Sequence, residues 1–489
     1  MEKVRTLTIA FLLSTPVLFA QPRVVYSTYF GGSGAEVVTA STLDEQGRVW
    51  VTGYTLSNDL PISNAPYLQV RPGQRDVFVA QIDTTKTGPD SLLYATYIGG
   101  TGSDEPTCIA VAGGFVYIGG TTNSLDFPLA GTAYQPNPAD TQDAFVVKLD
   151  PAKGGNESLV YSSYLGGAGI DRINAIATRN GLIYVAGYTT ADNFPTTSNA
   201  LSNASRGRGD AFVSVIDPNT SPASSTLVFS TILSGIAMDS ATAIGVNTQG
   251  DIYVAGTTAS GDFTASSNGY QTAFQGAADV FLVRINANRS RAYSSFLGGS
   301  LHDVPLSLAV TGTDVVMIAG YTLSQNFPTT DGAPRRDAAG GGDAFLARLN
   351  LDNSGSAQLT FSTLIGGNGG DVATSVSAGP NGTAYVTGYS LSDDFPLVGE
   401  ALQPKHSGAI DAFIARVDPA GRTLQYSTLF GGASVDNATG VHQLNACEVA
   451  ITGQTQSRGL KISASAYQNA LNGLSDAFVT RANLCAAGQ

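Results

Sequence analysis

The chain has 489 residues, of which only 13% are charged, and its 25 basic against 38 acidic side chains give a net charge of −13. An acidic chain without a basic cluster is unsuited to binding nucleic acid or anionic lipid surfaces. Abundant glycine (57 residues) and a preference for Tyr and Phe over Trp favour short strands joined by tight turns.

The N-terminus has the pattern of an export signal. A short basic start precedes an apolar stretch, residues 6–19, and Ala20 stands before the expected cleavage point. An uncleaved membrane anchor is the alternative, although the stretch is short for a membrane span. We therefore expect residues 1–20 to be a signal peptide. Residues 21–489 are then a single mature domain, secreted, periplasmic or at the cell surface, with no membrane span after cleavage.

One seven-residue segment recurs seven times along the rest of the chain. Each copy starts with Tyr or Phe, continues with small polar residues and ends, in six copies, with Gly-Gly. The copies start 64 to 68 residues apart, at residues 26, 94, 161, 229, 293, 361 and 426. A constant period over the whole mature chain indicates a repeat architecture rather than two unrelated domains.

Each period contains four runs with strand character. In the third period these runs are residues 173–178, 182–187, 210–217 and 227–233. The run that begins with Asp is apolar on both faces, which is typical of a strand buried between two layers. Four antiparallel strands repeated seven times predict an all-β, seven-bladed β-propeller. A β-solenoid is the alternative, but its coils are shorter than this period.

The repeated motifs are Tyr-Ser-Thr-Tyr-Leu-Gly-Gly, Val-Tyr-Val-Thr-Gly-Tyr-Thr, Asp-Phe-Pro and Asp-Ala-Phe-Val-x-Lys-Leu-Asp. Together they resemble the bacterial seven-bladed β-propeller repeat family over residues 24–485. The resemblance implies an extracytoplasmic propeller, and it implies no activity, cofactor or catalytic residue. Copies four and seven depart from the pattern, because Ser234 replaces a glycine, Thr264 replaces a proline and residues 459–461 replace Asp-Phe-Pro. We expect altered loops in those two blades.

The order of the runs predicts how the ring closes. By analogy with other propellers, the strands of a blade are named A (innermost) to D (outermost). The mature chain begins with a D run, residues 24–30, and ends with a C run, residues 476–483. The N-terminal strand is therefore expected to complete the last blade, which leaves no open seam.

The same order sorts the loops between the two faces of the disc. The D–A links and the long B–C loops are expected on one face, here called the loop-rich face, and the short A–B and C–D turns on the other. Long loops on a rigid scaffold commonly carry binding sites. A ligand site is therefore expected on the loop-rich face.

An acidic residue stands at one position of every D–A link, near the mouth of the central channel. A ring of carboxylates could bind a hard cation such as Ca²⁺. The alternative, which we favour, is that each carboxylate accepts backbone N–H bonds within its own link, because a residue common to all blades is economically explained as a part of the blade. The seven residues are Glu36, Asp104, Asp171, Asp239, Asp303, Asp371 and Asp436.

Three further repeated positions favour structural roles. The Asp that opens each C strand is expected to be structural as well. A position occupied by Asp, Asn or Gly in the B–C loops, as at Asp59 and Asn193, is expected to be a turn site that needs a left-handed backbone. The second glycine of each pair, from Gly32 to Gly432, never varies, which positive φ or close packing would explain.

Residues that occur in single blades are better candidates for function. The only tryptophan, Trp50, occupies a position held by Tyr in four other blades and is interpreted as packing. Two histidines and four arginines fall on the loop-rich face, where they could contact a ligand or, for the histidines, act as general bases. These candidates are His302, His406, Arg206, Arg208, Arg335 and Arg336. No HExxH, GxSxG, P-loop or CxxC motif occurs, and no cofactor is expected.

The three cysteines predict one disulfide in an exported chain. Cys447 immediately precedes strand B of the last blade, and Cys485 follows the end of its strand C. These strands are antiparallel neighbours, so the two residues are expected to meet within bridging range. Cys108 lies inside a strand A and is expected to be a buried free thiol. Two unpaired thiols at 447 and 485 are the alternative.

The sequence thus favours a non-catalytic extracytoplasmic binding or scaffold protein that engages a protein or polysaccharide partner through its loop-rich face. The alternative is a propeller enzyme that acts on glycans, with carboxylates and a histidine at the channel mouth. The fold itself hosts both classes. A deep off-axis pocket with two close carboxylates from different blades would favour the enzyme.

Overall fold

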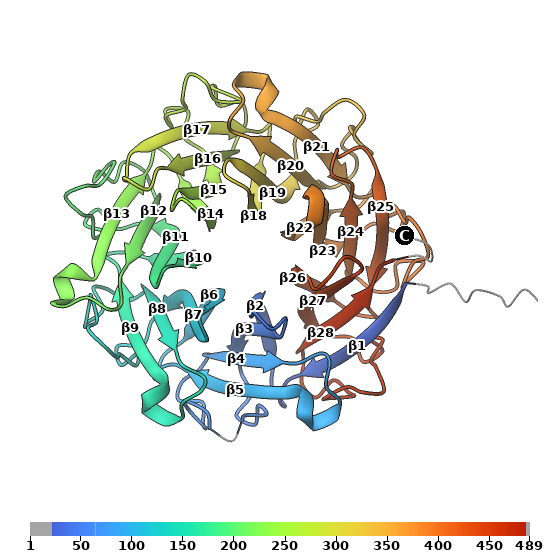
Figure 1. Ribbon diagram of the computed structural model, residues 1–489, viewed down its shortest axis with the longest axis horizontal. Coiled ribbons are helices and arrows are strands. Elements are labelled where there is room, and N and C mark those ends of the chain that lie inside the picture. Colours follow the sequence, from blue (N-terminus) through green and yellow to red (C-terminus); the bar gives the residue numbers. More distant parts are fainter. Residues whose placement is uncertain (1–21, 64, 486–489) are drawn as a thin grey trace, which may run out of the picture.

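The computed structural model describes residues 22–63 and 65–485. In this part of the chain, 28 strands form seven four-stranded antiparallel sheets, which stand like blades around a central channel (Figure 1). The predicted all-β, seven-bladed propeller is confirmed. The predicted signal peptide lies outside the described residues. Among the described residues, no helix has the length and apolar character needed to cross a bilayer.

Each blade has its strands in the order A, B, C, D from the channel outward. The A strands are β2 (Glu36–Leu43), β6 (Asp104–Ala112), β10 (Asp171–Arg179), β14 (Asp239–Val246), β18 (Asp303–Thr311), β22 (Asp371–Ala378) and β26 (Asp436–Gln443). The B strands are β3 (Val49–Thr55), β7 (Phe115–Thr122), β11 (Leu182–Thr189), β15 (Ile252–Thr258), β19 (Val315–Thr322), β23 (Ala384–Ser390) and β27 (Glu448–Thr455).

The outer half of each blade consists of strands C and D. The C strands are β4 (Asp76–Ile82), β8 (Asp143–Leu149), β12 (Asp210–Ile216), β16 (Asp279–Ile285), β20 (Asp343–Asn350), β24 (Asp411–Val417) and β28 (Asp476–Asn483). The D strands are β5 (Leu92–Ile98), β9 (Leu159–Leu165), β13 (Leu227–Leu233), β17 (Arg291–Leu297), β21 (Leu359–Ile365), β25 (Leu424–Phe430) and β1 (Arg23–Phe30).

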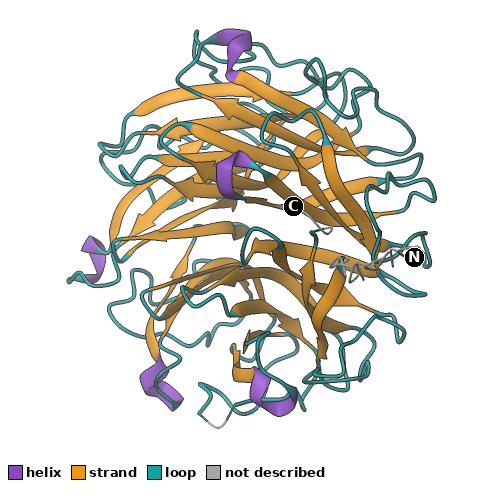
Figure 2. Cartoon of the chain, turned by 45° about the vertical axis from the view of Figure 1, so that its right-hand side comes forward, coloured by secondary structure: helices purple, strands orange, loops and turns teal. Residues whose placement is uncertain are grey.

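Five short 3₁₀ helices complete the described secondary structure, four in C–D turns and the last in an A–B turn. They are η1 (Gly88–Ser91), η2 (Gly155–Ser158), η3 (Ala223–Ser225), η4 (Gly355–Gln358) and η5 (Pro380–Gly382). The strands run through the thickness of the disc, and the loops lie at its two faces and its rim (Figure 2).

The N-terminal strand closes the ring as predicted. Strand β1 pairs antiparallel with β28 and is the outermost strand of the last blade, blade 7. It buries Tyr26, Tyr29 and Phe30 almost completely. The blade therefore joins the two ends of the described chain, so that every blade has four strands.

The hydrophobic core is divided into seven clusters, one between each pair of neighbouring blades. The C strands supply residues to both sides, which is why they are apolar on both faces; in β8, Phe145 belongs to one cluster and Val146 to the next. The Phe of the Asp-Phe-Pro motif packs against the Phe of its own C strand, with ring centroids 4.6 Å apart for Phe127 and Phe145.

The long B–C loops do more than cover one face. Their two ends lie at the loop-rich face, but their middle parts run along the outer strand D, as at Leu68, which pairs with Tyr97, and Gln135, which pairs with Tyr164. These contacts occupy the outer edge of the blade, which an exposed strand would leave open to pairing with other chains. The prediction that the B–C loops lie on one face holds only for their ends.

Candidate functional site

The acidic residue of each D–A link is the centre of a buried hydrogen-bond network. In blade 2, Asp104 is fully buried, and it accepts hydrogen bonds from the Gly100 N–H (2.8 Å) and the hydroxyls of Thr122 and Ser124. The acidic residues of the other six links also accept the N–H of the second glycine. Each acid thus already uses at least one carboxylate oxygen as an acceptor, although Oδ1 of Asp171, Asp239 and Asp371 has no hydrogen-bond partner among the described residues.

These carboxylates lie close to the Asp that opens each C strand. A Cβ placed on Gly99 would lie 2.2 Å from one Asp76 oxygen and 2.7 Å from one Asp104 oxygen, so the first glycine separates two buried acids. Burial, together with the nearby Asp104, raises the pKa of Asp76 to about 7, although the Gly73 N–H opposes this shift. Both side chains are fully buried, so a substrate cannot reach them. The pair instead holds the D–A link and the B–C loop together.

The arrangement favours the structural interpretation of the acidic ring. Among the described residues, no group of three or more His, Cys, Asp or Glu side chains is placed to hold a metal ion. Each C-strand Asp accepts N–H bonds from the end of the preceding B–C loop, as Asp411 does from Ser407 (2.7 Å). In each repeat, the acidic residue of the D–A link therefore holds that link in place, and the Asp that opens strand C holds the end of the B–C loop in place.

The Asp or Asn of the B–C loops has a different role from the predicted one. Asp59 is not in the left-handed region; among the described residues only Asn180, Arg289 and Asn381 combine a side chain with positive φ. Instead its carboxylate accepts the Ser33 N–H at 2.8 Å, in the D–A link of the same blade. In six blades an Asp or Asn acts as this acceptor, whereas blade 7 has Gly459, and this role corrects the backbone argument drawn from the sequence.

The invariant second glycine is explained by close packing. A Cβ on Gly32 would lie 2.6 Å from the side chains of Ser57 and Asp59, and its φ is not positive. Of the two explanations that the sequence left open, only the packing one applies.

The two candidate histidines lie in different surroundings. His302 is exposed in the D–A link of blade 5. His406 is only 9% exposed in its side chain, and its Nε2 lies 3.2 Å from the Ser390 carbonyl oxygen and 3.8 Å from the Asp411 carboxylate. His406 therefore packs against the start of a C strand and offers little surface to a ligand.

The four candidate arginines also divide into two kinds. Arg206 and Arg208 are exposed in the B–C loop of blade 3. Arg335 bonds the Gly366 carbonyl and pairs with Asp343 (3.0 Å), while Arg336 pairs with an exposed aspartate. The structure does not bring the six candidates together, since they come from the loops of blades 3, 5 and 6.

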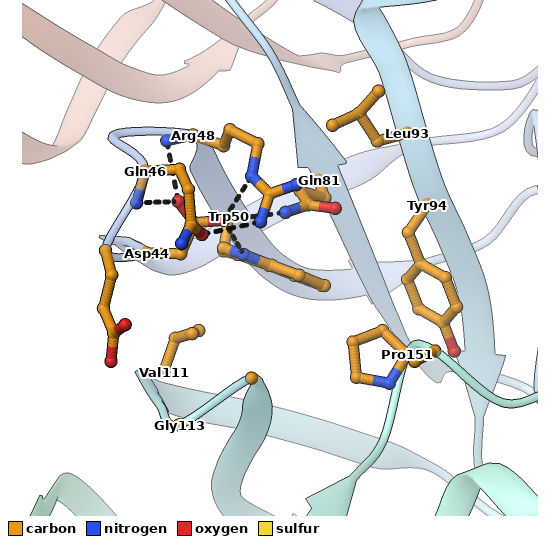
Figure 3. A pocket seen from close by; sticks show the side chains of 13 residues that line it. Asp44, Gln46, Arg48, Trp50, Gln81, Leu93, Tyr94, Val111, Gly113 and Pro151 are labelled. Carbon is orange, nitrogen blue, oxygen red and sulfur yellow. Dashed lines mark hydrogen bonds and ion pairs between the residues drawn. The ribbon is translucent and has the colours of Figure 1, made fainter.

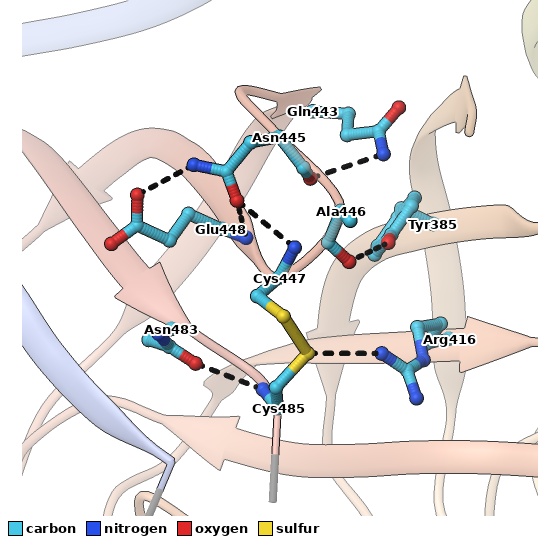
Figure 4. Close-up of a disulfide and its surroundings, with 9 residues drawn as sticks. All are labelled: Tyr385, Arg416, Gln443, Asn445, Ala446, Cys447, Glu448, Asn483 and Cys485. Atoms are coloured by element: carbon cyan, nitrogen blue, oxygen red, sulfur yellow. Dashed lines mark hydrogen bonds between the residues drawn. A yellow bond between two sulfur atoms is a disulfide. The ribbon is translucent and has the colours of Figure 1, made fainter. Parts of the chain in front are cut away.

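The predicted disulfide between Cys447 and Cys485 is present, with the two Cα atoms 5.1 Å apart (Figure 4). The bridge fixes the end of β28 to the start of β27. Cys108 is the buried free thiol predicted, and burial raises its pKa to about 12.

Apolar side chains are exposed mainly at the loop-rich face. Twelve large apolar residues are exposed in the described part of the chain, and all but Leu93 and Val228 lie in D–A links or B–C loops. The other ten are Leu56, Val70, Leu125, Ile170, Ile236, Met238, Leu301, Leu323, Leu391 and Leu474. Leu125, Ile236 and Leu474 are at least 70% exposed. Contiguous patches of exposed apolar side chains mark interaction surfaces, and these ten side chains are distributed over the loops of all seven blades.

A cavity of about 340 Å³ lies between blades 1 and 2 on the opposite face, among the short turns (Figure 3). Its walls include Arg48, Trp50 and Gln81 from blade 1 and Gly113 and Pro151 from blade 2. The interpretation of Trp50 as packing is correct, because only 2% of the residue is exposed. The sequence signal for the cavity was the combination of a single tryptophan with a glutamine in place of the basic residue of other C strands.

A second arrangement that sequence reasoning missed lies in the central channel. His442, on strand A of blade 7, has its Nε2 2.7 Å from the hydroxyl of Ser41 on strand A of blade 1. Burial lowers the pKa of His442 to about 4, so the ring is neutral. The Ser41 hydroxyl also bonds Thr452 at 2.6 Å, and no carboxylate of the described residues is bonded to the ring. The pair therefore joins two blades and lacks the third group of a hydrolytic triad.

No protein-family model and no curated protein matches the chain. Solved structures resemble it weakly. A protein of unknown function from Dyadobacter fermentans is 10% identical, with a TM-score of 0.40, over 95% of this chain and 99% of that one. An apocarotenoid oxygenase from Synechocystis is 9% identical, with a TM-score of 0.32, over 68% of this chain and 62% of that one. The class of the protein, a closed seven-bladed β-propeller, is therefore defined by its own strands.

Proposed function

We propose that the protein is a non-catalytic binding or scaffold propeller of an extracytoplasmic compartment, which engages a protein or glycan partner through its loop-rich face. The observation that carries this proposal is that ten of the twelve exposed large apolar side chains of the described residues lie in the D–A links and B–C loops. Buried core residues of an interface are typically apolar, and the exposed Arg206 and Arg208 add polar contacts beside them.

Three features support the extracytoplasmic location. The disulfide is of a kind that persists in oxidising compartments. Residues 1–20 have the composition of an export signal. The repeat motifs resemble those of the bacterial seven-bladed β-propeller repeat family, and we propose that the chain belongs to it.

A glycan-cleaving enzyme with its site at the channel mouth is the less supported candidate. Such an enzyme needs two carboxylates that reach the sugar. The paired carboxylates of this protein, such as Asp76 and Asp104, are fully buried and flank a glycine. We therefore expect binding without turnover.

The proposal is tested with the purified chain, residues 21–489, on a glycan array and on an array of envelope proteins from the producing organism, together with a hydrolase screen. The binding of each hit is then measured for a loop-face variant that combines Leu125→Ser with Ile236→Ser. The matched control is Val228→Ser, an exposed apolar residue on the outer strand β13.

We expect the loop-face variant to lose at least about tenfold in affinity, because the loss of exposed apolar anchors weakens interfaces, while the control binds like wild type. Equal binding by the loop-face variant would exclude this face as the binding surface. Turnover of any glycan would replace the proposal by the enzymatic alternative.

A further inference from the structure

The seven blades provide an internal comparison for the cavity between blades 1 and 2. At the position of Gln81, near the end of strand C, five other blades carry a basic residue and blade 3 carries a valine. The basic residues are Lys148, Arg284, Arg348, Arg416 and Arg481. Blade 1 is thus the only blade with a neutral polar side chain at this position.

Some of the basic residues at this position reach the next blade, whereas Arg481 pairs with Glu448 of its own blade and Lys148 lies over aromatic rings of its own blade. Arg284 of blade 4 pairs with Asp314 in the A–B turn of blade 5. Arg348 of blade 5 donates to the Pro419 carbonyl in the C–D turn of blade 6 at 2.8 Å. These long side chains connect one blade to the turns of the next.

The boundary between blades 1 and 2 is left open instead. Gln81 is shorter and bonds Asp44 within its own blade at 2.8 Å. The facing A–B turn of blade 2 consists of Gly113 and Gly114, and a Cβ built on either residue would have no neighbour within 4 Å. The cavity of about 340 Å³ follows from these two departures from the repeat.

Asp44 holds the polar wall of the cavity in place. Its carboxylate accepts hydrogen bonds from the Arg48 guanidinium (2.7 Å), the Trp50 indole (3.3 Å) and the Gln81 amide. Burial raises the pKa of Asp44, but the hydrogen bonds from Arg48 outweigh it and hold this pKa below its ordinary value. Asp44 therefore stays ionised, and the side chains around it are pre-organised.

The opposite wall is apolar and contains a buried hydroxyl. Tyr94 is 4% exposed, its hydroxyl is buried, and its ring centroid is 5.9 Å from that of Trp50. Leu93 and Pro151 also line the cavity on this side (Figure 3).

From this geometry we infer that the cavity binds a neutral saccharide unit. A pyranose ring presents apolar C–H faces and several hydroxyls, which suit an apolar wall of Leu93 and Pro151 opposite a wall of amide, guanidinium and carboxylate groups. Arg48 and Asp44 compensate each other's charge, and Glu45 leaves one negative charge at the rim. An anionic ligand is therefore disfavoured. This site lies on the face opposite the loop-rich face and does not depend on the function proposed there.

The single tryptophan of the chain makes the site directly measurable. Trp50 fluorescence is recorded while the disulfide-bonded chain is titrated with neutral hexoses and N-acetylhexosamines, and with glucuronate and glucosamine as charged probes. We expect a saturable change with at least one neutral sugar, confirmed by calorimetry.

Two variants locate the binding. Gln81→Arg installs the basic side chain that other blades tolerate at this position, and Ala152→Tyr adds bulk at an exposed residue of the cavity wall. Each is expected to weaken sugar binding at least tenfold at unchanged thermal stability, while Val228→Ser on the outer strand β13 leaves it unchanged. The inference is overturned if no neutral sugar gives a saturable signal, if only a charged probe binds, or if binding persists in both variants.

Discussion

The closure of the ring by β1 depends most directly on Phe30. This residue is fully buried in the cluster between blades 7 and 1, and its ring centroid lies 6.0 Å from that of Phe78 in blade 1. Phe30→Ala removes a packed ring from the junction of the two chain ends. Large-to-small substitutions of buried aromatic residues cost about 3–5 kcal/mol, which is a large part of the total stability of a typical protein.

The free energy of unfolding is measured by urea denaturation at neutral pH, with Arg23→Ala as the matched control. Arg23 is exposed at the start of the same strand, so its substitution should change the stability by less than about 0.5 kcal/mol. Deletion of residues 21–32 is expected to be worse than Phe30→Ala, because it also exposes the edge of β28 to aggregation.

The role of β1 in closing the ring is refuted if the deletion variant unfolds at the urea concentration of the wild type. It is also refuted if Phe30→Ala and Arg23→Ala have the same small effect. Either result would mean that the ring is held closed without the N-terminal strand.

Four further predictions concern buried groups. Cys447→Ser removes a disulfide between residues separated by 38 positions and should lower the free energy of unfolding by about 3–4 kcal/mol, because the unfolded chain gains entropy. Free thiols at both cysteines of the wild type, detected by peptide mapping, would contradict the disulfide. The pKa of Asp76 is raised to about 7 from 3.8, so its contribution to the free energy of unfolding is complete below pH 4 and is lost as the pH rises through 7. Asp76→Asn should therefore flatten the dependence of stability on pH between these values. An unchanged slope in the variant would refute the pKa shift. Asp171→Asn should lower the free energy of unfolding by about 1 kcal/mol, because its hydrogen bond from the Gly167 N–H is weakened. Ca²⁺ added to the wild type should not raise its melting temperature. A strong rise that a chelator reverses would establish a cation site instead. Gly99→Ala should lower the free energy of unfolding by about 1–3 kcal/mol, because the added Cβ would collide with two carboxylates. An unchanged melting temperature would show that the two carboxylates can move apart.

The repeated features of the molecule could be predicted from the sequence because each is seen seven times. Strand order, the closure by residues 24–30 and the structural role of Asp104 and its equivalents all follow from residues that recur at one position. The disulfide was predictable because Cys447 and Cys485 lie at facing ends of neighbouring strands. For Asp59, the sequence identified the repeated position correctly but not its role. Its hydrogen-bond partner, Ser33, lies in another loop, which the sequence pattern does not reveal.

The features that occur once depended on the tertiary structure. His442 meets Ser41 across 401 residues, and only the closed ring brings the two strands together. The cavity beside Trp50 exists for two reasons. The Gln81 side chain bonds Asp44 in its own blade and does not extend to the next blade, and Gly113 and Gly114 in the facing turn have no side chains to fill the space. The sequence by itself determined the fold, because periodic burial and turn chemistry act within each repeat. The tertiary structure decided where space is left open, because that depends on the packing of side chains from neighbouring repeats.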